Sequence, residues 1–97
     1  MPMLILQTLE QTPKHGYRIA MEIKAKSKGV LDFKEGTLYP TLHGLENKGY
    51  LKSSEHVEQG RTRIYYELTP RGREALDAER AQWRELSKAV RLVLEGA

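Results

Sequence analysis

One stretch decides the fold: residues 35–51, EGTLYPTLHGLENKGYL. A single apolar stripe at helical spacing runs through it, formed by Leu38, Leu42 and Leu45. Gly49 follows Lys48 at the point where a residue in the left-handed conformation typically ends a helix. The pattern predicts a helix that begins close to Gly36 or Thr37 and ends at Lys48.

The opposite face of this predicted helix is small, polar and nearly free of acidic residues. It carries Thr37, Pro40, Thr41, Gly44 and Lys48. A helix that meets only solvent would more often carry Glu, Lys and Arg on that face, so we expect a surface that approaches a partner closely. The major groove of DNA is about 12 Å wide and admits one helix.

Pro40 indicates where this helix begins. Proline in a helix interior costs about 3 kcal/mol, and the cost is lower in the first turn, where the N–H groups have no partner within the helix. We therefore expect Pro40 near the N-terminal end, together with Thr37 and Tyr39. The free N–H groups and partial positive charge of that end are suited to phosphate.

The composition narrows the possible functions. The chain has 97 residues, enough for one small domain, and its formal net charge of +3 is compatible with a nucleic-acid partner. It contains no cysteine, which excludes disulfides, thiol catalysis and cysteine-based zinc sites. The apolar opening Met3–Leu6 is too short for a signal peptide or a membrane span, so we expect a cytoplasmic protein without a membrane partner.

Motifs of catalysis or metal binding do not stand out. The sequence lacks a phosphate-binding glycine loop, a nucleophile motif and paired carboxylates framed by a histidine. His15, His43 and His56 are too scattered to suggest a metal site. We therefore expect a protein that is not an enzyme and that uses no cofactor or metal.

Periodicity and turn residues assign the other elements. The expected order is a helix over Met3–Glu10, a helix from His15 to about Ser27, a short strand over Val30–Phe33, the helix described above, strands over Tyr50–Glu55 and Thr62–Leu68, and a helix from Pro70 to about Leu94. Thr69 suits the N-cap of the last helix, and Pro70 suits its first position.

The polar connection 56–61 contains a glycine, as a hairpin tip would. Arg61 and Arg63 flank it, either to contact phosphate or a minor groove or only to keep the hairpin soluble.

The last predicted helix is too long for a small core to cover. Along it, Leu76, Trp83 and Val90 are seven residues apart, and Leu86 and Val93 repeat in the same way. Such a seam in an otherwise charged helix is typical of packing against another helix. We expect its distal half to dock on a second copy of the chain, which gives a homodimer.

This order of elements matches a winged helix-turn-helix, with three helices, the third in a groove, and a hairpin beside them. The expected fold class is mainly α with a small β-hairpin. We expect residues 1–69 to form a winged helix-turn-helix DNA-binding domain and residues 70–97 to form a C-terminal dimerisation helix. Winged helices also mediate protein contacts, so a protein-interaction module without DNA binding is the alternative function.

Three motifs in this order resemble the PadR family of bacterial transcriptional regulators: His15-Gly16-Tyr17, then GTLYPTL in residues 36–42, then RIYYELT in residues 63–69. The triplet alone is a weak signal, whereas the two longer blocks make the resemblance specific. The length of the chain matches the subgroup with a single C-terminal helix. The resemblance implies a homodimeric repressor that binds double-stranded DNA at a palindromic operator and releases it when a small, often planar aromatic effector binds.

Candidate DNA contacts follow from the resemblance and from the polar face of the central helix. They are Tyr17, Thr37, Tyr39, Pro40, Thr41, His43, Lys48, Arg61 and Arg63. Tyr17 and Tyr39 also have a structural interpretation, as core aromatics whose hydroxyls reach the rim. Gly44 stands where many relatives carry a longer polar side chain, so base contacts from that position are missing and specificity relies on neighbours or on DNA shape.

Trp83 has two interpretations, which can both hold. A tryptophan in the seam is a typical anchor of a dimer interface. The resemblance also implies a ligand role, because in some multidrug-binding members a tryptophan stacks on planar ligands between the two last helices. Leu86 and Val90 follow it along the seam, so these three residues are the candidate effector site or dimer interface.

Overall fold

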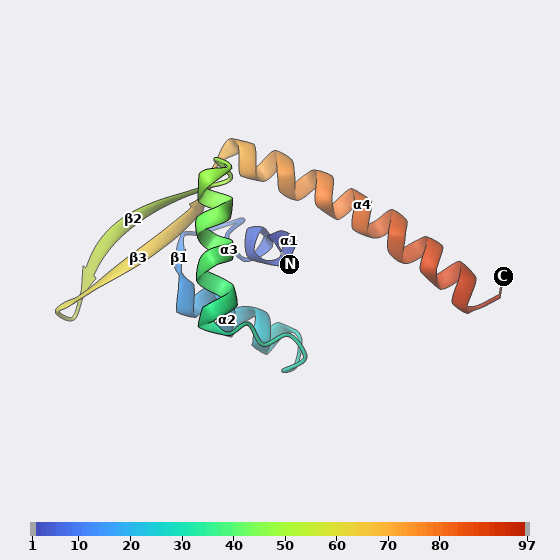
Figure 1. Ribbon diagram of the computed structural model, residues 1–97, viewed down its shortest axis with the longest axis horizontal. Coiled ribbons are helices and arrows are strands. Elements are labelled where there is room, and N and C mark those ends of the chain that lie inside the picture. The colour runs from blue at the N-terminus through green and yellow to red at the C-terminus, as the bar shows by residue number, and fades with distance from the viewer. Residues whose placement is uncertain (1, 97) are drawn as a thin grey trace.

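The computed structural model describes residues 2–96, which fold into helices and a small antiparallel sheet (Figure 1). The elements are α1 (Pro2–Thr8), β1 (Lys14–His15), α2 (Gly16–Lys26), α3 (Glu35–Asn47), β2 (Leu51–Glu58), β3 (Arg61–Leu68) and α4 (Pro70–Leu94). This arrangement confirms the predicted fold class, which is mainly α with a β-hairpin, the wing, and a long C-terminal helix.

One apolar core joins the helices to the base of the wing. Its most completely buried side chains are Ile5, Leu6, Leu9, Ile19, Leu42 and Leu76. The apolar stripe of residues 35–51 lies inside it, as predicted, because Leu38, Leu42 and Leu45 are all buried. Since burial of apolar surface is the main favourable term in folding, this stripe decides which face of α3 is left to solvent.

The start of α3 differs from the prediction. The Lys34 carbonyl accepts a hydrogen bond from the Leu38 amide at 2.8 Å, so the first turn already begins at Glu35. Pro40 therefore lies in the second turn of the helix rather than the first. Its missing N–H would have paired with the carbonyl of Gly36, a residue that is exposed and therefore within reach of water.

The end of α3 is the one predicted. Gly49 has a φ of +81°, and the Tyr50 amide donates to the Leu45 carbonyl at 3.0 Å. These are the features of a Schellman motif, in which a residue in the left-handed conformation closes the helix. Lys48 is the C-cap, one residue beyond the last helical position.

The predicted strand over Val30–Phe33 is wrong. These residues belong to the connection between α2 and α3 and form no strand. Leu31 and Phe33 pack against the core, which explains why the segment is apolar without being paired. Burial of side chains from an irregular connection produces the same short apolar run as a strand does.

The third strand is instead β1, which precedes α2. It pairs antiparallel with β3 at Tyr65 and Tyr66, so the strand order is β1-β3-β2. Lys14 in β1 also forms a salt bridge with Glu22 of α2 at 2.7 Å. These contacts attach the start of α2 directly to the wing.

The wing is longer than predicted and its turn is tighter. β2 and β3 pair in register as far as Glu58 opposite Arg61, which leaves only Gln59 and Gly60 for the turn. Both turn residues have positive φ, 50° and 79° respectively. Two such residues are typical of a type I′ turn, whose twist matches that of the hairpin strands.

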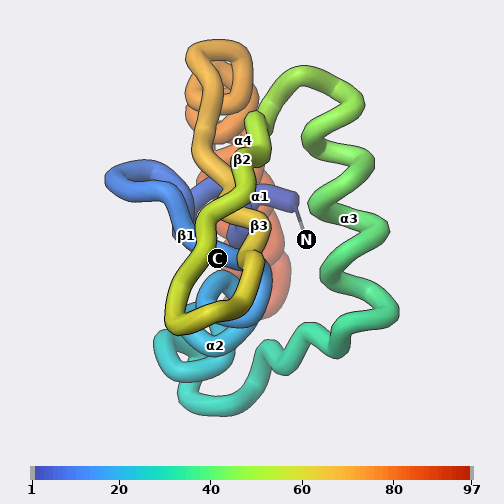
Figure 2. Tube along the Cα trace, turned by 90° about the vertical axis from the view of Figure 1, so that its left-hand side faces the viewer, coloured from blue at the N-terminus to red at the C-terminus, as the bar shows by residue number. Residues whose placement is uncertain are grey.

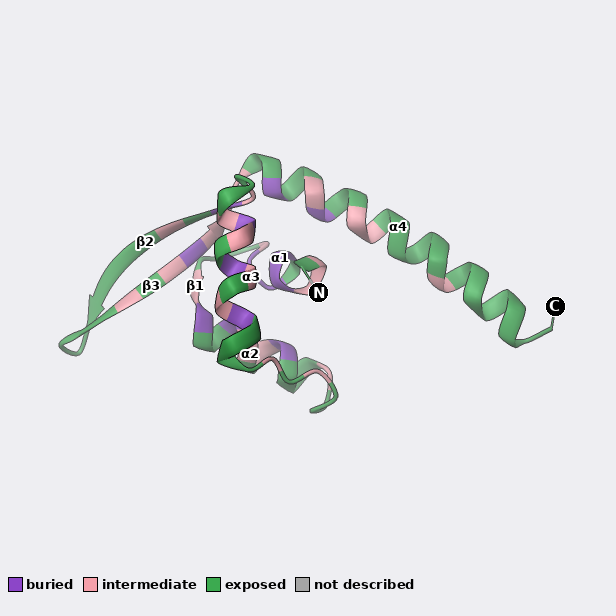
Figure 3. Cartoon of the chain, viewed as in Figure 1, coloured by how far each residue is buried: buried purple, intermediate pink, exposed green. Residues whose placement is uncertain are grey.

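The long helix α4 starts as predicted and then leaves the body of the molecule. The Thr69 hydroxyl caps it by accepting a hydrogen bond from the Gly72 amide at 3.0 Å. Its first half packs on α1 and on the connection after it, where Arg80 lies 2.9 Å from the Glu10 carboxylate. The second half extends away and is exposed along nearly all of its length (Figures 1 and 3).

Candidate nucleic-acid interface

The outer face of α3 is uncovered. Figure 2 shows α3 at one side of the molecule, beside the wing and above α2. Thr37, Pro40 and His43 are exposed along it, and Thr41 and Gly44 are half-buried. Within residues 2–96, no segment lies over this face, so a helix with small polar side chains is presented directly to solvent.

Thr41 contributes less to this face than its sequence position suggests. Its hydroxyl donates a hydrogen bond to the Thr37 carbonyl at 2.8 Å, the usual behaviour of a helical threonine. The proton is therefore engaged within the helix, and the oxygen remains available only as an acceptor. Thr37 itself has an exposed side chain at the third position of α3.

The two candidate tyrosines have different environments. Tyr17, in the first turn of α2, is 62% exposed and projects from the body. Tyr39 is half-buried and lies over Gly16, where a Cβ atom would come within 2.8 Å of its ring. Tyr39 therefore packs α3 against the start of α2, in agreement with the structural interpretation, whereas the side chain of Tyr17 is left exposed to solvent.

The two wing arginines also differ. Arg61 follows the turn directly and is exposed. Arg63 bends back towards the body, where its Nη1 lies 3.1 Å from His15 Nε2 and its Nε lies 3.7 Å from a Glu58 oxygen. Arg61 is thus displayed at the tip, whereas Arg63 joins the wing to the start of α2.

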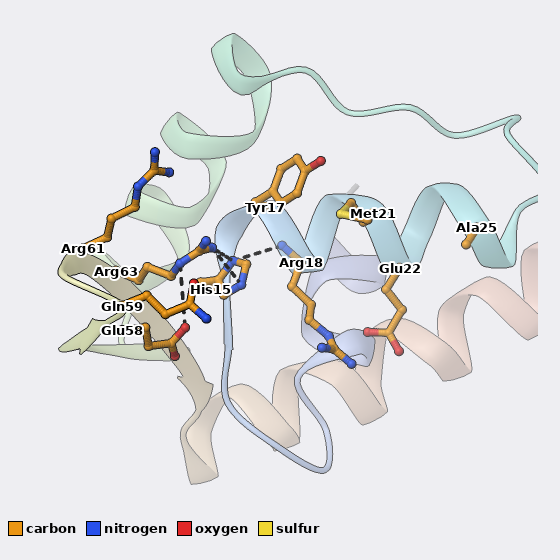
Figure 4. Close-up of a pocket in the computed structure, with 10 residues that line it drawn as sticks. All are labelled: His15, Tyr17, Arg18, Met21, Glu22, Ala25, Glu58, Gln59, Arg61 and Arg63. Carbon is orange, nitrogen blue, oxygen red and sulfur yellow. Dashed lines mark hydrogen bonds and ion pairs between the residues drawn. The ribbon is translucent and has the colours of Figure 1, made fainter.

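An open groove of about 1040 Å³ separates the wing from α2 (Figure 4). It is lined by His15, Tyr17, Arg18, Met21, Glu22, Ala25, Glu58, Gln59, Arg61 and Arg63. Arg18 is a lining cation that the sequence analysis did not single out. Its place in the first turn of α2, next to Tyr17, is the signal that could have identified it.

His15 was also missed as a contributor to this region. Its Nδ1 accepts a hydrogen bond from the Arg18 amide at 3.2 Å and so caps α2. Partial burial, followed by the nearby Arg63 guanidinium, holds the pKa of His15 below its ordinary value. Both effects favour the neutral ring, because burial and a neighbouring cation each disfavour an imidazolium ion.

The seam of α4 is bare in the single chain. Trp83 is 50% exposed, and Leu86 and Val90 are exposed to a similar degree. A shallow cleft of about 310 Å³ lies between this part of α4 and Pro2 and Met3 of α1. Large apolar side chains in a row on one surface are typical of a protein contact.

Two further properties of the described residues bear on function. None of the helices between residues 2 and 96 combines the length and apolar character needed to cross a membrane. In the same residues, no group of three or more histidine, aspartate or glutamate side chains is placed to hold a metal ion. The surface features that bear on function are the polar face of α3, the groove between the wing and α2, and the apolar seam of α4.

Three helices, a wing and an uncovered third helix define a winged-helix protein. Residues 5–78 match the family described as the transcriptional regulator PadR-like family. The chain belongs to this family of transcriptional regulators.

Individual relatives agree with this assignment. Transcriptional regulator Rv3488 of Mycobacterium tuberculosis is 40% identical over 81 residues, which cover 84% of this chain and 63% of that protein. The chain thus spans a little under two thirds of that relative. A solved transcriptional regulator from Clostridium thermocellum is 31% identical, with a TM-score of 0.87 and coverage of 94% of this chain and 89% of that one.

A more distant structure shares the fold. Bacillus subtilis PadR, solved in complex with operator DNA, has a TM-score of 0.73 and 23% identity, over 79% of this chain and 44% of that one.

Proposed function

We propose that the chain is a homodimeric, sequence-specific DNA-binding repressor of the cytoplasm. In this proposal, α3 of each copy enters a major groove of a palindromic operator on double-stranded DNA. The observation that carries it is the bare outer face of α3, where Thr37, Pro40 and His43 are exposed and nearly free of acidic neighbours. Small side chains let a helix lie deep in a groove about 12 Å wide. The fold shared with a PadR solved in complex with operator DNA supports double-stranded DNA as the partner.

Phosphate contacts would surround the inserted helix. Lys48 at the C-cap of α3, Tyr17 and Arg18 on α2, and Arg61 on the wing are all exposed. Cations at such positions neutralise phosphates and supply affinity that does not depend on sequence. Tyr39 and Arg63 act mainly by holding α3 and the wing in place, with Thr41 and His43 left to face the bases.

The proposed division of labour assigns residues 1–69 to DNA and residues 70–97 to dimerisation. Trp83, Leu86 and Val90 would anchor the seam between the two copies of α4, although Leu76 near its start already completes the core. A two-fold dimer would present the two α3 helices to successive major grooves, about 34–36 Å apart on one face of the duplex.

The effector in this proposal is a planar aromatic molecule that stacks on Trp83 between the two α4 helices. Because Trp83 is the only tryptophan in the chain, its fluorescence reports on this site alone. Quenching by planar aromatic compounds that also release DNA would support the effector role. Release from DNA without any change in Trp83 fluorescence would place the effector site elsewhere.

A charge-insertion pair tests the placement of α3. Thr37→Glu adds a carboxylate at the third position of α3, which suits the helix dipole, so the variant should fold normally. In the proposed complex the same carboxylate faces DNA, and we expect binding to the chain's own upstream DNA to be nearly abolished in a gel shift. Gln11→Glu adds the same charge in the exposed loop before β1 and serves as the control. Equal binding by the two variants would refute the placement.

The wing contact is tested through salt dependence. The logarithm of the binding constant falls with the logarithm of salt concentration by about 0.9 per phosphate neutralised. Arg61→Gln should reduce this slope by about one and weaken binding to all DNA sequences alike. If the slope is unchanged, Arg61 does not contact phosphate. If the native chain binds no upstream DNA at low salt, the protein-interaction module is the better explanation of the fold.

A further inference from the structure

We propose that His15 is a positioning residue that holds the wing against α2, and that it does so only while its imidazole is neutral. The wing then presents Arg61 to DNA near neutral pH and is released under mildly acidic conditions. The effect on DNA rests on the function proposed above, whereas the effect on the wing does not. His15 lies where β1, α2 and the wing meet (Figure 4).

The first observation is that both ring nitrogens of His15 face hydrogen-bond donors. Nδ1 accepts from the Arg18 amide at 3.2 Å. Nη1 of Arg63 lies 3.1 Å from Nε2 and 3.5 Å from Nδ1. A guanidinium group can only donate, and a neutral imidazole has one nitrogen that accepts, so the ring accepts from Arg18 and Arg63 together only through Nδ1, and through Nε2 it accepts from Arg63 alone. A protonated ring accepts nothing, so it would lose the cap of α2 and repel Arg63 at the same time.

The second observation is the set of charges around the ring. Arg63 and Tyr65 face it from β3, Glu58 from the end of β2, and Tyr17 and Arg18 from α2. Glu58 is the one carboxylate among them, and it is shared, because it also accepts from the Tyr65 hydroxyl and pairs with Arg63. The surroundings therefore favour a neutral ring.

The third observation is that the His15 side chain, next to the backbone pairing of β1 with β3, joins the wing to α2. Its ring is parallel to that of Tyr17, with centroids 6.5 Å apart, and it meets Tyr65 edge-on at 5.5 Å. Beyond this point the wing is a two-stranded hairpin whose outer residues are exposed. Such a hairpin is marginally stable alone, so the direction of its tip depends on the contact at its root.

The sign of the pH effect follows from the lowered pKa of His15. When the wing is released, the pKa of His15 returns towards its ordinary value. The ring therefore binds a proton more readily in the released state than in the docked state. Acid therefore favours release, beginning as the pH falls below the ordinary value of about 6.5.

A distance measurement tests the docked wing without DNA. The chain has no cysteine, so Val57→Cys on the wing and Ala25→Cys on α2 accept two spin labels uniquely. Labelled chain is diluted into excess unlabelled chain to remove distances between copies. We expect a narrow distribution at about pH 7.5 and a longer, broader one at about pH 5.5, either side of the ordinary histidine value.

Matched variants assign the response to one histidine. His15→Asn keeps a side-chain acceptor for the cap of α2 but lacks a titratable ring, so its distribution should be broad at both pH values. His56→Asn removes the histidine that packs on the other side of Tyr65 and should leave the pH response unchanged. Identical distributions at both pH values in the native sequence, or loss of the response in His56→Asn rather than in His15→Asn, would overturn the proposal.

The consequence for DNA is measured by comparing the native chain with His15→Asn, which share every other histidine. The native chain should bind upstream DNA about tenfold more tightly than His15→Asn at about pH 7.5 and equally at about pH 5.5, the size expected when one charge-assisted contact is lost. A pH-dependent distance with an affinity ratio that is the same at both pH values would limit His15 to the wing and reject its role in DNA contact. An absence of DNA binding at every pH would refute the proposed function, while the distance measurement would still decide the role of His15.

Discussion

Gly72 and Tyr50 are in contact through their backbones at the junction of α3, the wing and α4. A Cβ atom on Gly72 would collide with the Tyr50 carbonyl oxygen and come within 2.9 Å of a Leu68 methyl carbon. The same carbonyl oxygen accepts a hydrogen bond from the Thr69 amide at 3.1 Å. The first turn of α4 is therefore seated directly on the segment that ends α3, and the absence of a side chain at Gly72 sets how closely the two can approach.

Gly72→Ala should consequently destabilise the protein. The atom that obstructs the new methyl group belongs to the backbone, which cannot rotate away, so we expect a loss of about 3 kcal/mol in the free energy of unfolding, at the upper end for overpacked sites. Gly36→Ala is the matched control, because it also lies in a first helical turn and nothing lies within 4 Å of its Cβ position. The free energy of unfolding of Gly36→Ala should increase by up to about 1 kcal/mol. Urea denaturation of both variants measures the difference, and equal stabilities would contradict the close approach.

Arg80 should stabilise the contact of α4 with α1 in a pH-dependent manner. Its guanidinium lies 2.9 Å from the Glu10 carboxylate and 2.8 Å from the Gln7 amide oxygen. This hydrogen-bonded cation lowers the pKa of Glu10, so the native state binds the proton less readily than the unfolded chain does. The stabilisation is therefore present above the ordinary glutamate value of 4.5 and is lost as the pH falls through the lowered one.

The corresponding experiment compares the native chain with Arg80→Gln by thermal unfolding across this range. We expect the native chain to have a higher Tm than Arg80→Gln at neutral pH. This difference in Tm should disappear as Glu10 is protonated. Asp77→Asn, which removes a more exposed partner of Arg80 at 3.6 Å, should change little. A gap that stays constant down to about pH 3 would mean that Glu10 is not the responsible partner.

The features of this fold that the sequence could predict are local ones. The apolar stripe of α3, the left-handed Gly49 after it and the Thr69 cap of α4 all depend on residues within a few positions of each other. The bare face of α3 was predictable for the same reason, because burial of one helical stripe determines the opposite one.

Long-range contacts were not predictable. β1 is only two residues long and exists because β3, some fifty positions later, offers an edge. Arg63 was expected at the exposed tip, yet it turns back to His15, 48 residues away in sequence. A single sequence does not distinguish a solvated arginine from one that is paired within the chain. Only the tertiary structure decides which of the candidate residues are free to contact a partner.

Trp83 should control the oligomeric state. It is the largest side chain in the exposed seam of α4, and buried tryptophans at the centre of interfaces often contribute 2 kcal/mol or more. Trp83→Ala should therefore raise the dissociation constant of the proposed dimer by roughly thirty-fold, measured by sedimentation over a range of concentrations. Lys88→Ala changes an exposed residue five positions on, which at 100° per residue lies on the other side of the helix, and should have no such effect. A dimer that tolerates Trp83→Ala would have to use another surface.

The turn of the wing offers a substitution that should increase stability. Gln59 has a φ of 50°, in the left-handed region, and it precedes Gly60 with a φ of 79°. Residues with a Cβ atom lose about 1–2 kcal/mol in this conformation, and asparagine loses less because its short side chain bonds locally. Gln59→Asn creates the Asn-Gly pair favoured in type I′ turns and should recover about 0.5 kcal/mol. Gly60→Ala, at the second turn position, should lower the free energy of unfolding by about 1 kcal/mol. If the turn is type I′, chemical denaturation should show a higher free energy of unfolding for Gln59→Asn and a lower one for Gly60→Ala. Equal changes in the two variants would indicate that the wing reverses through a longer loop, as its polar sequence first suggested.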